Sequence, residues 1–310
     1  MRRTAAAVLA FACAAGAVVL AQQGQGQVPT PYPLANPIRE RGSSVTGAFE
    51  GWYYNKDGGV SLLVGYFNRN TKQELDIPVG PNNRIEMPPV RGTVDWGQPT
   101  HFQTGRQFGV FSIRVPKDFG GNGGDKELTW TLIVNGQTNV ITMHTKNDWI
   151  VSPFEDPANK NTPPSIRFQP GGPAFQGPPT AIAASLDAVV GEGLPLTVYA
   201  TDEGPKVNVE PPAPSSRARG RGTFGPPPLA VSWSLMRGPA AVKFENAKPA
   251  IDKENGGKAT TTAYFGAPGE YVLRIQGNDA TGDGGGGFQC CWTNAHVRVT
   301  VKPANTGNNF

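Results

Sequence analysis

The sequence is poor in charged residues, histidine and cysteine. Charged residues make up 17% of its 310 residues, and it has three histidines and three cysteines. His101, His144 and His296 are scattered without the spacing of metal ligands, and no G-x-S-x-G nucleophile motif is present. The formal net charge of the full chain is +4, and it would be +2 without Arg2 and Arg3 near the N-terminus. So small a charge gives no reason to expect nucleic acid or anionic lipid as a partner.

Glycine and proline are abundant instead, with 40 and 30 residues. This composition argues against helices, and within residues 43–168 apolar residues nowhere recur at helical spacing over three turns. Many short strands joined by tight turns fit this composition. The sequence therefore predicts an all-β protein made of two β-sandwich domains.

The N-terminus predicts export. The basic pair Arg2 and Arg3 precedes an apolar run that ends at Ala21, so residues 1–21 are interpreted as a signal peptide cleaved after Ala21. A retained anchor and a lipoprotein signal at Cys13 are the alternatives, but the apolar run continues past Cys13. We expect a periplasmic or extracellular protein with no membrane span after cleavage, followed by a disordered leader at 22–42.

Residues 43–168 are predicted to form the first sandwich, jelly-roll-like or immunoglobulin-like. Turn residues Asp57-Gly58 and Asn135-Gly136 each separate two runs of β-forming residues, which predicts two hairpins. A proline- and glycine-rich linker is expected at 169–182.

The second sandwich is expected at 183–303, followed by a tail at 304–310. Its strands alternate apolar and polar residues, as at Val231–Leu235 and Val297–Val301. His296 is out of phase with the apolar positions and is interpreted as a surface residue. The Thr-rich run 259–265 is interpreted as an edge or solvated strand.

This second half resembles the PKD and related immunoglobulin-like repeats of bacterial extracellular proteins. The resemblance rests on 196–204 (LTVYATDEG), 231–244 (VSWSLMRGPAAVKF) and 259–279 (ATTTAYFGAPGEYVLRIQGND). It covers about a third of the chain, and the long insertion at 203–228 departs from the family pattern. The whole chain resembles secreted bacterial proteins with this two-part layout. The resemblance implies Trp233 as the core tryptophan and Tyr271 as a tyrosine corner.

After export the remaining cysteines are adjacent, at Cys290 and Cys291. We expect a vicinal disulfide, which would lock a loop or stack on a sugar beside Trp292. Two free thiols and an intermolecular bridge are the alternatives.

Two loops are expected at one end of the second sandwich. They carry four acids, Asp202, Glu203, Asp279 and Asp283, which would form a Ca²⁺ site if they converged. Turn capping by Asp is the alternative, because no DxDxDG-type loop is present. The RARGR tract at 217–221 is interpreted as a solvated loop, with contact to an acidic glycan or phosphate as the alternative.

Aromatic residues gather near residue 50. Trp52, Tyr53, Tyr54 and the distant Trp292 are candidate ligand-binding residues, because exposed aromatics stack on sugar rings. For the cluster as a whole, packing in the core is favoured, with one or two members on the outward face.

These observations together favour an exported, non-catalytic binding or spacer module at the cell envelope, which contacts polysaccharide or another protein. The alternative is an extracellular hydrolase with a carboxylate pair in the first sandwich, for which Glu50 and Asp76 are candidates. No cofactor is expected apart from the calcium considered above. A third hypothesis is a redox- or metal-responsive adhesin using the cysteine pair and its neighbouring acids.

Overall fold

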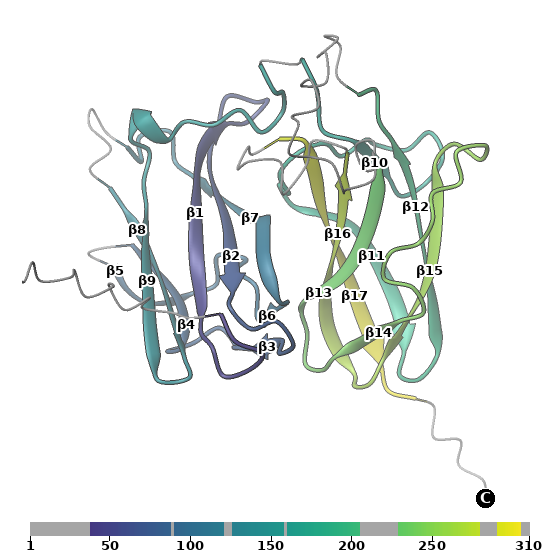
Figure 1. The fold of residues 1–310 in the computed structure, drawn as a ribbon, viewed down its shortest axis with the longest axis horizontal. Helices are drawn as coiled ribbons and strands as arrows, with labels where there is room; N and C mark the ends of the chain where they lie inside the picture. The colour runs from purple at the N-terminus through teal and green to yellow at the C-terminus, as the bar shows by residue number, and fades with distance from the viewer. Residues whose placement is uncertain are drawn as a thin grey trace, which may run out of the picture. The chain divides into compact units, whose positions relative to one another are not determined.

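Almost every regular element of the protein is a β-strand. The computed structural model describes residues 38–87, 90–120, 126–157, 160–204, 229–279 and 290–304. In this part of the chain the one helical element is a 3-10 turn, η1, at Asn147–Trp149. The strands build two β-sandwiches (Figure 1), so the all-β prediction is confirmed. Both sandwiches belong to one compact unit that begins at Ile38.

The first sandwich packs a sheet of order β1-β2-β7 against a sheet of order β5-β4-β8-β9, and a short pair, β3-β6, lies beside them. Leu62 and Val64 from the first sheet meet Trp130 and Leu132 from the second in one buried core. The strands are β1 (Val45–Tyr54), β2 (Val60–Asn68), β3 (Leu75–Asp76), β4 (Asn83–Met87), β5 (Val90–Val94), β6 (His101–Phe102), β7 (Gly105–Val115), β8 (Leu128–Val134) and β9 (Gln137–Met143).

Both predicted hairpins are present. The turn after β1 is closed by the Gly58 N–H, which donates to Asn55 O at 2.8 Å, and it leads into β2. Between β8 and β9, Asn135 and Gly136 have φ of 50° and 73°. Two successive residues at positive φ are what a type I′ turn requires, and Asn-Gly adopts them at little cost.

The second sandwich packs a sheet of order β10-β12-β15-β14 against a sheet of order β11-β17-β16-β13. The first strand of the latter sheet, β11, runs parallel to the last strand, β17, whereas the other pairs are antiparallel. The strands are β10 (Ser165–Arg167), β11 (Ile182–Val189), β12 (Gly193–Thr201), β13 (Ala230–Arg237), β14 (Val242–Phe244), β15 (Lys258–Phe265), β16 (Gly269–Asn278) and β17 (Trp292–Lys302).

Two core residues of this sandwich lie as the family resemblance implies. Trp233 is buried in its core. Tyr271 is fully buried, and its Oη donates to Ala267 O, four residues upstream, at 2.8 Å. This hydrogen bond ties the start of β16 to the preceding turn, as a tyrosine corner does.

Two strands differ from the sequence interpretation. The Thr-rich run that forms β15 is not an edge strand, because it lies between β12 and β14. Thr260 and Thr262 occupy the outward face, whereas Thr261 is buried on the same face as Ala259 and Ala263. Strand β10 lies before the expected boundary at 168 yet pairs with β12 of the second sandwich.

The face of β16 and β17 that points away from the second core is also covered. Arg274, Asn294 and His296 on this face are buried. Asn294 Nδ2 donates to Gly109 O at 2.9 Å, and His296 Nε2 lies 2.9 Å from Val110 O. Because a carbonyl oxygen only accepts, His296 Nε2 is the donor. The expectation of a surface position for His296 is therefore wrong.

Strand β7 is the end strand of its sheet, so one side of its backbone has no neighbouring strand. Asn294 and His296 donate to carbonyl groups of this strand, and Arg274 Nη1 donates to the Gln107 side chain at 2.9 Å. Such coverage prevents a free strand edge from pairing with another chain. It also joins the two sandwiches through specific hydrogen bonds rather than through the linker alone.

Candidate functional site

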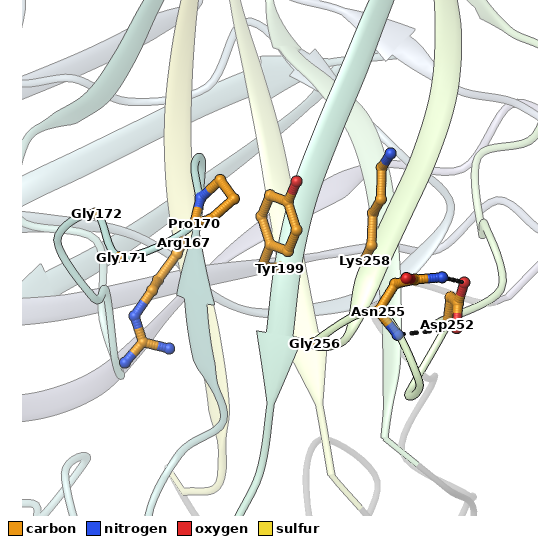
Figure 2. A pocket seen from close by; sticks show the side chains of 9 residues that line it. All are labelled: Arg167, Pro170, Gly171, Gly172, Tyr199, Asp252, Asn255, Gly256 and Lys258. Atoms are coloured by element: carbon orange, nitrogen blue, oxygen red, sulfur yellow. Dashed lines mark hydrogen bonds between the residues drawn. The ribbon is translucent and has the colours of Figure 1, made fainter.

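The residues of the candidate site come from three neighbouring strands. Arg167 on β10 is the register partner of Tyr199 on β12, and Tyr199 is the partner of Lys258 on β15. Leu196, Val198 and Ala200 of β12 are buried, so the intervening Tyr199 points to the opposite, outer face of the sheet. The three side chains stand side by side in Figure 2.

An open hollow of about 900 Å³ surrounds this row. We call it the tyrosine hollow. Two turns form its sides, one after β10 and one before β15 (Figure 2). The residues that line it are Arg167, Pro170, Gly171, Gly172, Tyr199, Asp252, Asn255, Gly256 and Lys258.

The turn before β15 depends on glycine. Gly256 and Gly257 have φ of 69° and 82°, which side chains rarely adopt. A Cβ at Gly257 would also collide with the carbonyl of Ala200. This close approach lets the Gly257 carbonyl accept from the Ala200 N–H at 2.9 Å, which holds the turn against β12 beside Tyr199.

The tyrosine hollow has two cations and one carboxylate. Arg167 and Lys258 form no ion pair within 4 Å with any residue that the structure describes. Asp252 is engaged within its own turn, where it accepts from the Asn255 side chain and from the N–H groups of Glu254 and Asn255. The hydrogen bonds from Asn255 are the largest cause that lowers the pKa of Asp252.

This arrangement suits one kind of chemistry. A tyrosine ring gives an apolar face for stacking, and its hydroxyl gives a polar edge. Arginine and lysine on either side supply donors for a carboxylate or sulfate group. A sugar ring that carries an acidic group would satisfy both elements of the row.

Of the predicted ligand-binding aromatics, three are buried. Trp52, Tyr53 and Trp292 are 5%, 1% and 0% exposed, so none of them can stack on a ligand, and that interpretation is wrong for all three. Their strands direct these side chains inward. Trp52 packs in the first core, whereas Tyr53 and Trp292 pack in a small cluster with Leu63. Only Tyr54, 58% exposed, is accessible.

Cys290 and Cys291 are joined by a disulfide across a cis peptide bond. Both are buried, at 5% and 0% exposed, so stacking of this ring on a sugar is excluded. Trp292, the next residue, packs against Gly109 of β7 so closely that a Cβ at position 109 would overlap its ring. The cysteine pair thus lies within the covered region where β17 begins.

The four acids predicted to bind calcium do not form a metal site in the described part of the chain. No group of three or more histidine, cysteine, aspartate or glutamate residues there is arranged to hold a metal. Asp279 is buried and accepts from Asn161 Nδ2 at 2.6 Å. Burial raises the pKa of Asp202, and the charge of Asp279 adds to this. Asp283 and the tract at 217–221 lie outside the described residues.

The two carboxylates proposed for hydrolysis each have structural partners. Glu50 is buried, and it accepts from Arg106 Nη2 at 2.6 Å and from the Gly109 N–H at 2.8 Å. Burial raises the pKa of Glu50, whereas Arg106 and the Gly109 N–H oppose that rise. Gly65 is needed here, because a Cβ at that position would collide with the Glu50 carboxylate.

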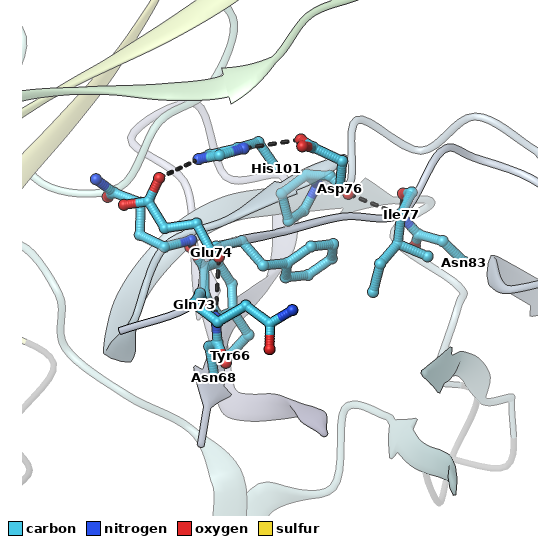
Figure 3. Close-up of polar contacts among 11 residues, drawn as sticks. Tyr66, Asn68, Gln73, Glu74, Asp76, Ile77, Asn83 and His101 are labelled. Atoms are coloured by element: carbon cyan, nitrogen blue, oxygen red, sulfur yellow. Dashed lines mark hydrogen bonds and ion pairs between the residues drawn. The ribbon is translucent and has the colours of Figure 1, made fainter. Parts of the chain in front are cut away.

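Asp76 belongs to a different cluster. Its Oδ1 lies 2.8 Å from His101 Nδ1, and Glu74 Oε2 lies 3.0 Å from His101 Nε2 (Figure 3). Burial lowers the pKa of His101, but hydrogen bonds and charges from Glu74 and Asp76 outweigh it and raise the pKa overall. Glu50 and Asp76 thus have separate hydrogen-bond partners.

Sequence reasoning did not single out Arg167, Tyr199 or Lys258. The strand predicted at 259–265 begins one residue after Lys258, and the first domain predicted at 43–168 includes Arg167. The available signal was the alternation of β12, which predicts an outward Tyr199, together with a Gly-Gly turn immediately before Lys258.

Comparisons with known proteins show no family for this chain. No protein-family model and no curated protein match the chain. Among solved structures, similarity is found to domains 4 and 5 of the S-layer protein SbsC, with 12% identity over 84% of this chain and 98% of that chain, and a TM-score of 0.23. The D00-D0 domain of intimin has 12% identity over 84% of this chain and 100% of that chain, with a TM-score of 0.25.

Fibronectin(III)-like modules of Clostridium thermocellum CbhA have 12% identity over 86% of this chain and 98% of that chain, with a TM-score of 0.22. At these TM-scores the similarities carry no argument about function. In the described residues, no helix is long and apolar enough to cross a membrane.

Proposed function

We propose that this chain is an exported, non-catalytic binding module that holds an acidic polysaccharide on the outer face of its second sandwich. The observation that carries the proposal is the row of Arg167, Tyr199 and Lys258 on three neighbouring strands. Tyr199 stacks on a sugar ring, and the two cations bind its acidic group.

The open form of the site favours a polymer over a small metabolite. Sites for small molecules bury most of the ligand surface, whereas the tyrosine hollow is open and polar. The outer face continues along β12 and β15 through Thr197 and Thr260, whose hydroxyl groups lie 3.1 Å apart. A chain of sugars lying along these strands would meet further hydroxyl groups there.

Export is supported by the N-terminal sequence, which lies outside the described residues. A non-catalytic role is supported by the carboxylates, because Glu50 and Asp76 are engaged by separate partners. The spacer role considered from the sequence is compatible with this proposal, since a module can both separate and bind.

The test is binding of the mature protein, from Gln22 onward, to polygalacturonate and to its methyl-esterified, uncharged form. Calorimetry is expected to detect binding of the acidic polymer and much weaker binding of the ester. Tyr199→Ala should weaken binding about tenfold, from the loss of one stacking contact. Arg167→Gln with Lys258→Gln should weaken it by at least as much, with a loss that shrinks in high salt.

Lys302→Gln is the matched control, since Lys302 is an exposed lysine on the other sheet that pairs with Asp187. It should bind as the unmodified protein does. Equal binding of polygalacturonate and polyglutamate would contradict the proposal, because a plain polyanion has no ring to stack. Equal binding by the Tyr199→Ala variant would contradict it as well.

A further inference from the structure

A second hollow, of about 340 Å³, lies on the first sandwich, between β1, β7 and the segment 147–151. We call it the indole hollow, because Trp149 lines it with 46% of that residue exposed. Its neighbour Ile150, which also lines the hollow, is 52% exposed, and contiguous exposed apolar residues can mark a ligand-binding groove.

Trp149 is held firmly. Its ring stacks on Phe49 with 5.3 Å between centroids and 21° between planes, and it meets the His144 ring edge-on at 5.6 Å. The segment that carries it is fastened to β1, since the Val151 N–H donates to Trp52 O at 2.9 Å.

Glycine makes this attachment possible. Gly51 has a φ of 117°, and a Cβ there would lie 2.5 Å from Trp149 O and 2.6 Å from a Val151 methyl carbon. The chain register also shifts between Phe49 and Gly51, which leaves Glu50 as the extra residue of a bulge. The indole is therefore presented on a prearranged surface rather than on a loose loop.

The opposite wall consists of Phe108 with Arg106 above its ring at 4.1 Å. Arg106 is paired with the buried Glu50, so these two groups add no net charge to the hollow. The remaining charged group in the lining is Asp148, which is exposed. The lining thus offers no unpaired cation to bind an anion, whereas the tyrosine hollow offers Arg167 and Lys258.

Arg106 also offers hydrogen-bond capacity. The hydrogen bonds that it makes to described residues use Nη1 and Nη2, with Gln107 O, Tyr66 O and Glu50 as acceptors. None of them uses the Nε–H, and the side chain is 29% exposed. A flat aromatic face beside hydrogen-bonding groups and a net neutral or negative lining is the chemistry that suits a neutral sugar ring.

We propose that the indole hollow is a second binding site, specific for a neutral sugar ring that stacks on Trp149 and accepts a hydrogen bond from Arg106. It goes beyond the acidic site on the second sandwich, because the two hollows have different charge and lie on different sandwiches. Trp149 is not among the candidates for sugar stacking that the sequence offers in this sandwich, which are Trp52, Tyr53 and Tyr54.

The experiment is titration of the mature full chain with cellohexaose, xylohexaose and mannohexaose. Binding is measured by calorimetry and by tryptophan fluorescence. At least one of these is expected to bind. Trp149→Ala should weaken that binding about tenfold and Trp149→Phe less, since phenylalanine keeps part of the stacking surface. Trp149 is exposed, so these variants should fold, which circular dichroism checks.

Val140→Ala is the control, because Val140 is an exposed apolar residue on β9 of the same sandwich that does not line the indole hollow. It should bind like the unmodified protein, and so should Tyr199→Ala, which separates this site from the acidic one. Failure of all three sugars to bind at millimolar concentration would overturn the proposal. Unchanged binding by Trp149→Ala, or binding of N-acetyltryptophanamide in place of every sugar, would overturn it too.

Discussion

Acid should loosen the contact between the two sandwiches, and His296 is the residue that makes this measurable. It is buried on the outer face of β17 and donates to Val110 O of β7 at 2.9 Å. Burial is the main cause that lowers the pKa of His296 to about 4, and the charges of Arg274 and Arg237 lower it further. The hydrogen bond to Val110 opposes these effects without cancelling them.

The magnitude follows from proton linkage. A histidine in the unfolded chain titrates near pH 6.5, so between about pH 6.5 and 4 the unfolded state binds a proton that the folded state does not. The stabilising contribution is thus fully present above about pH 6.5 and is lost as the pH falls towards 4. At about 1.4 kcal/mol for each pH unit, the free energy of unfolding falls by roughly 3 kcal/mol over this range.

The assay is urea unfolding, followed by tryptophan fluorescence at several values between about pH 7.5 and 4, for the unmodified protein and for His296→Gln. Carboxylates contribute equally to both proteins, so their difference isolates the histidine. We expect the stability advantage of the unmodified protein to shrink by roughly 3 kcal/mol as the pH falls. If the two proteins show parallel pH dependence, the reasoning from burial is refuted.

Two further predictions concern other buried groups. His101→Gln should have the opposite pH signature, because the pKa of His101 is raised: its stabilising contribution is present below about pH 6.5 and is lost as the pH rises through the folded value. Urea unfolding at about pH 6 and 9 checks this, and a larger loss at the alkaline value would contradict it. Tyr271→Phe removes the hydrogen bond to Ala267 O and should lower the free energy of unfolding by about 1 kcal/mol. Thermal unfolding measures it, and no change would mean that this tyrosine corner does not stabilise the fold.

Local patterns were enough to predict both hairpins and several of the strands. Asn135-Gly136 specified its turn because few other residue pairs accept two positive φ values in succession. Alternation along 231–235 and 297–301 was also correct, since each strand has one face in a core. These features depend on neighbours in sequence, which is the information that a single chain provides.

Features set by distant contacts could not be predicted in this way. His296 alternates like a surface residue, and only the packing of β7 against this face makes it buried. Trp292 is predicted as a binding residue because it follows the cysteine pair, yet Gly109 of the other sandwich accommodates its ring. In both cases the second layer of burial comes from residues more than 180 positions away.

The candidate sites depend on distant contacts as well. Arg167, Tyr199 and Lys258 are brought together by strand register, which no local motif records. Trp149 lies in no predicted strand, and its ring is positioned by stacking on Phe49 and by the close approach of its backbone to Gly51. Aromatic content alone indicates a sugar-stacking site on β1, but Trp52 of that strand packs in the first core.

The most direct test of the central claim is calorimetric titration of the mature protein with polygalacturonate, comparing the unmodified chain, Tyr199→Ala and Lys302→Gln. We predict measurable binding by the unmodified chain and by Lys302→Gln, and about tenfold weaker binding by Tyr199→Ala. Equal affinity for all three proteins, or no binding by any of them, would contradict an acidic polysaccharide site on the second sandwich.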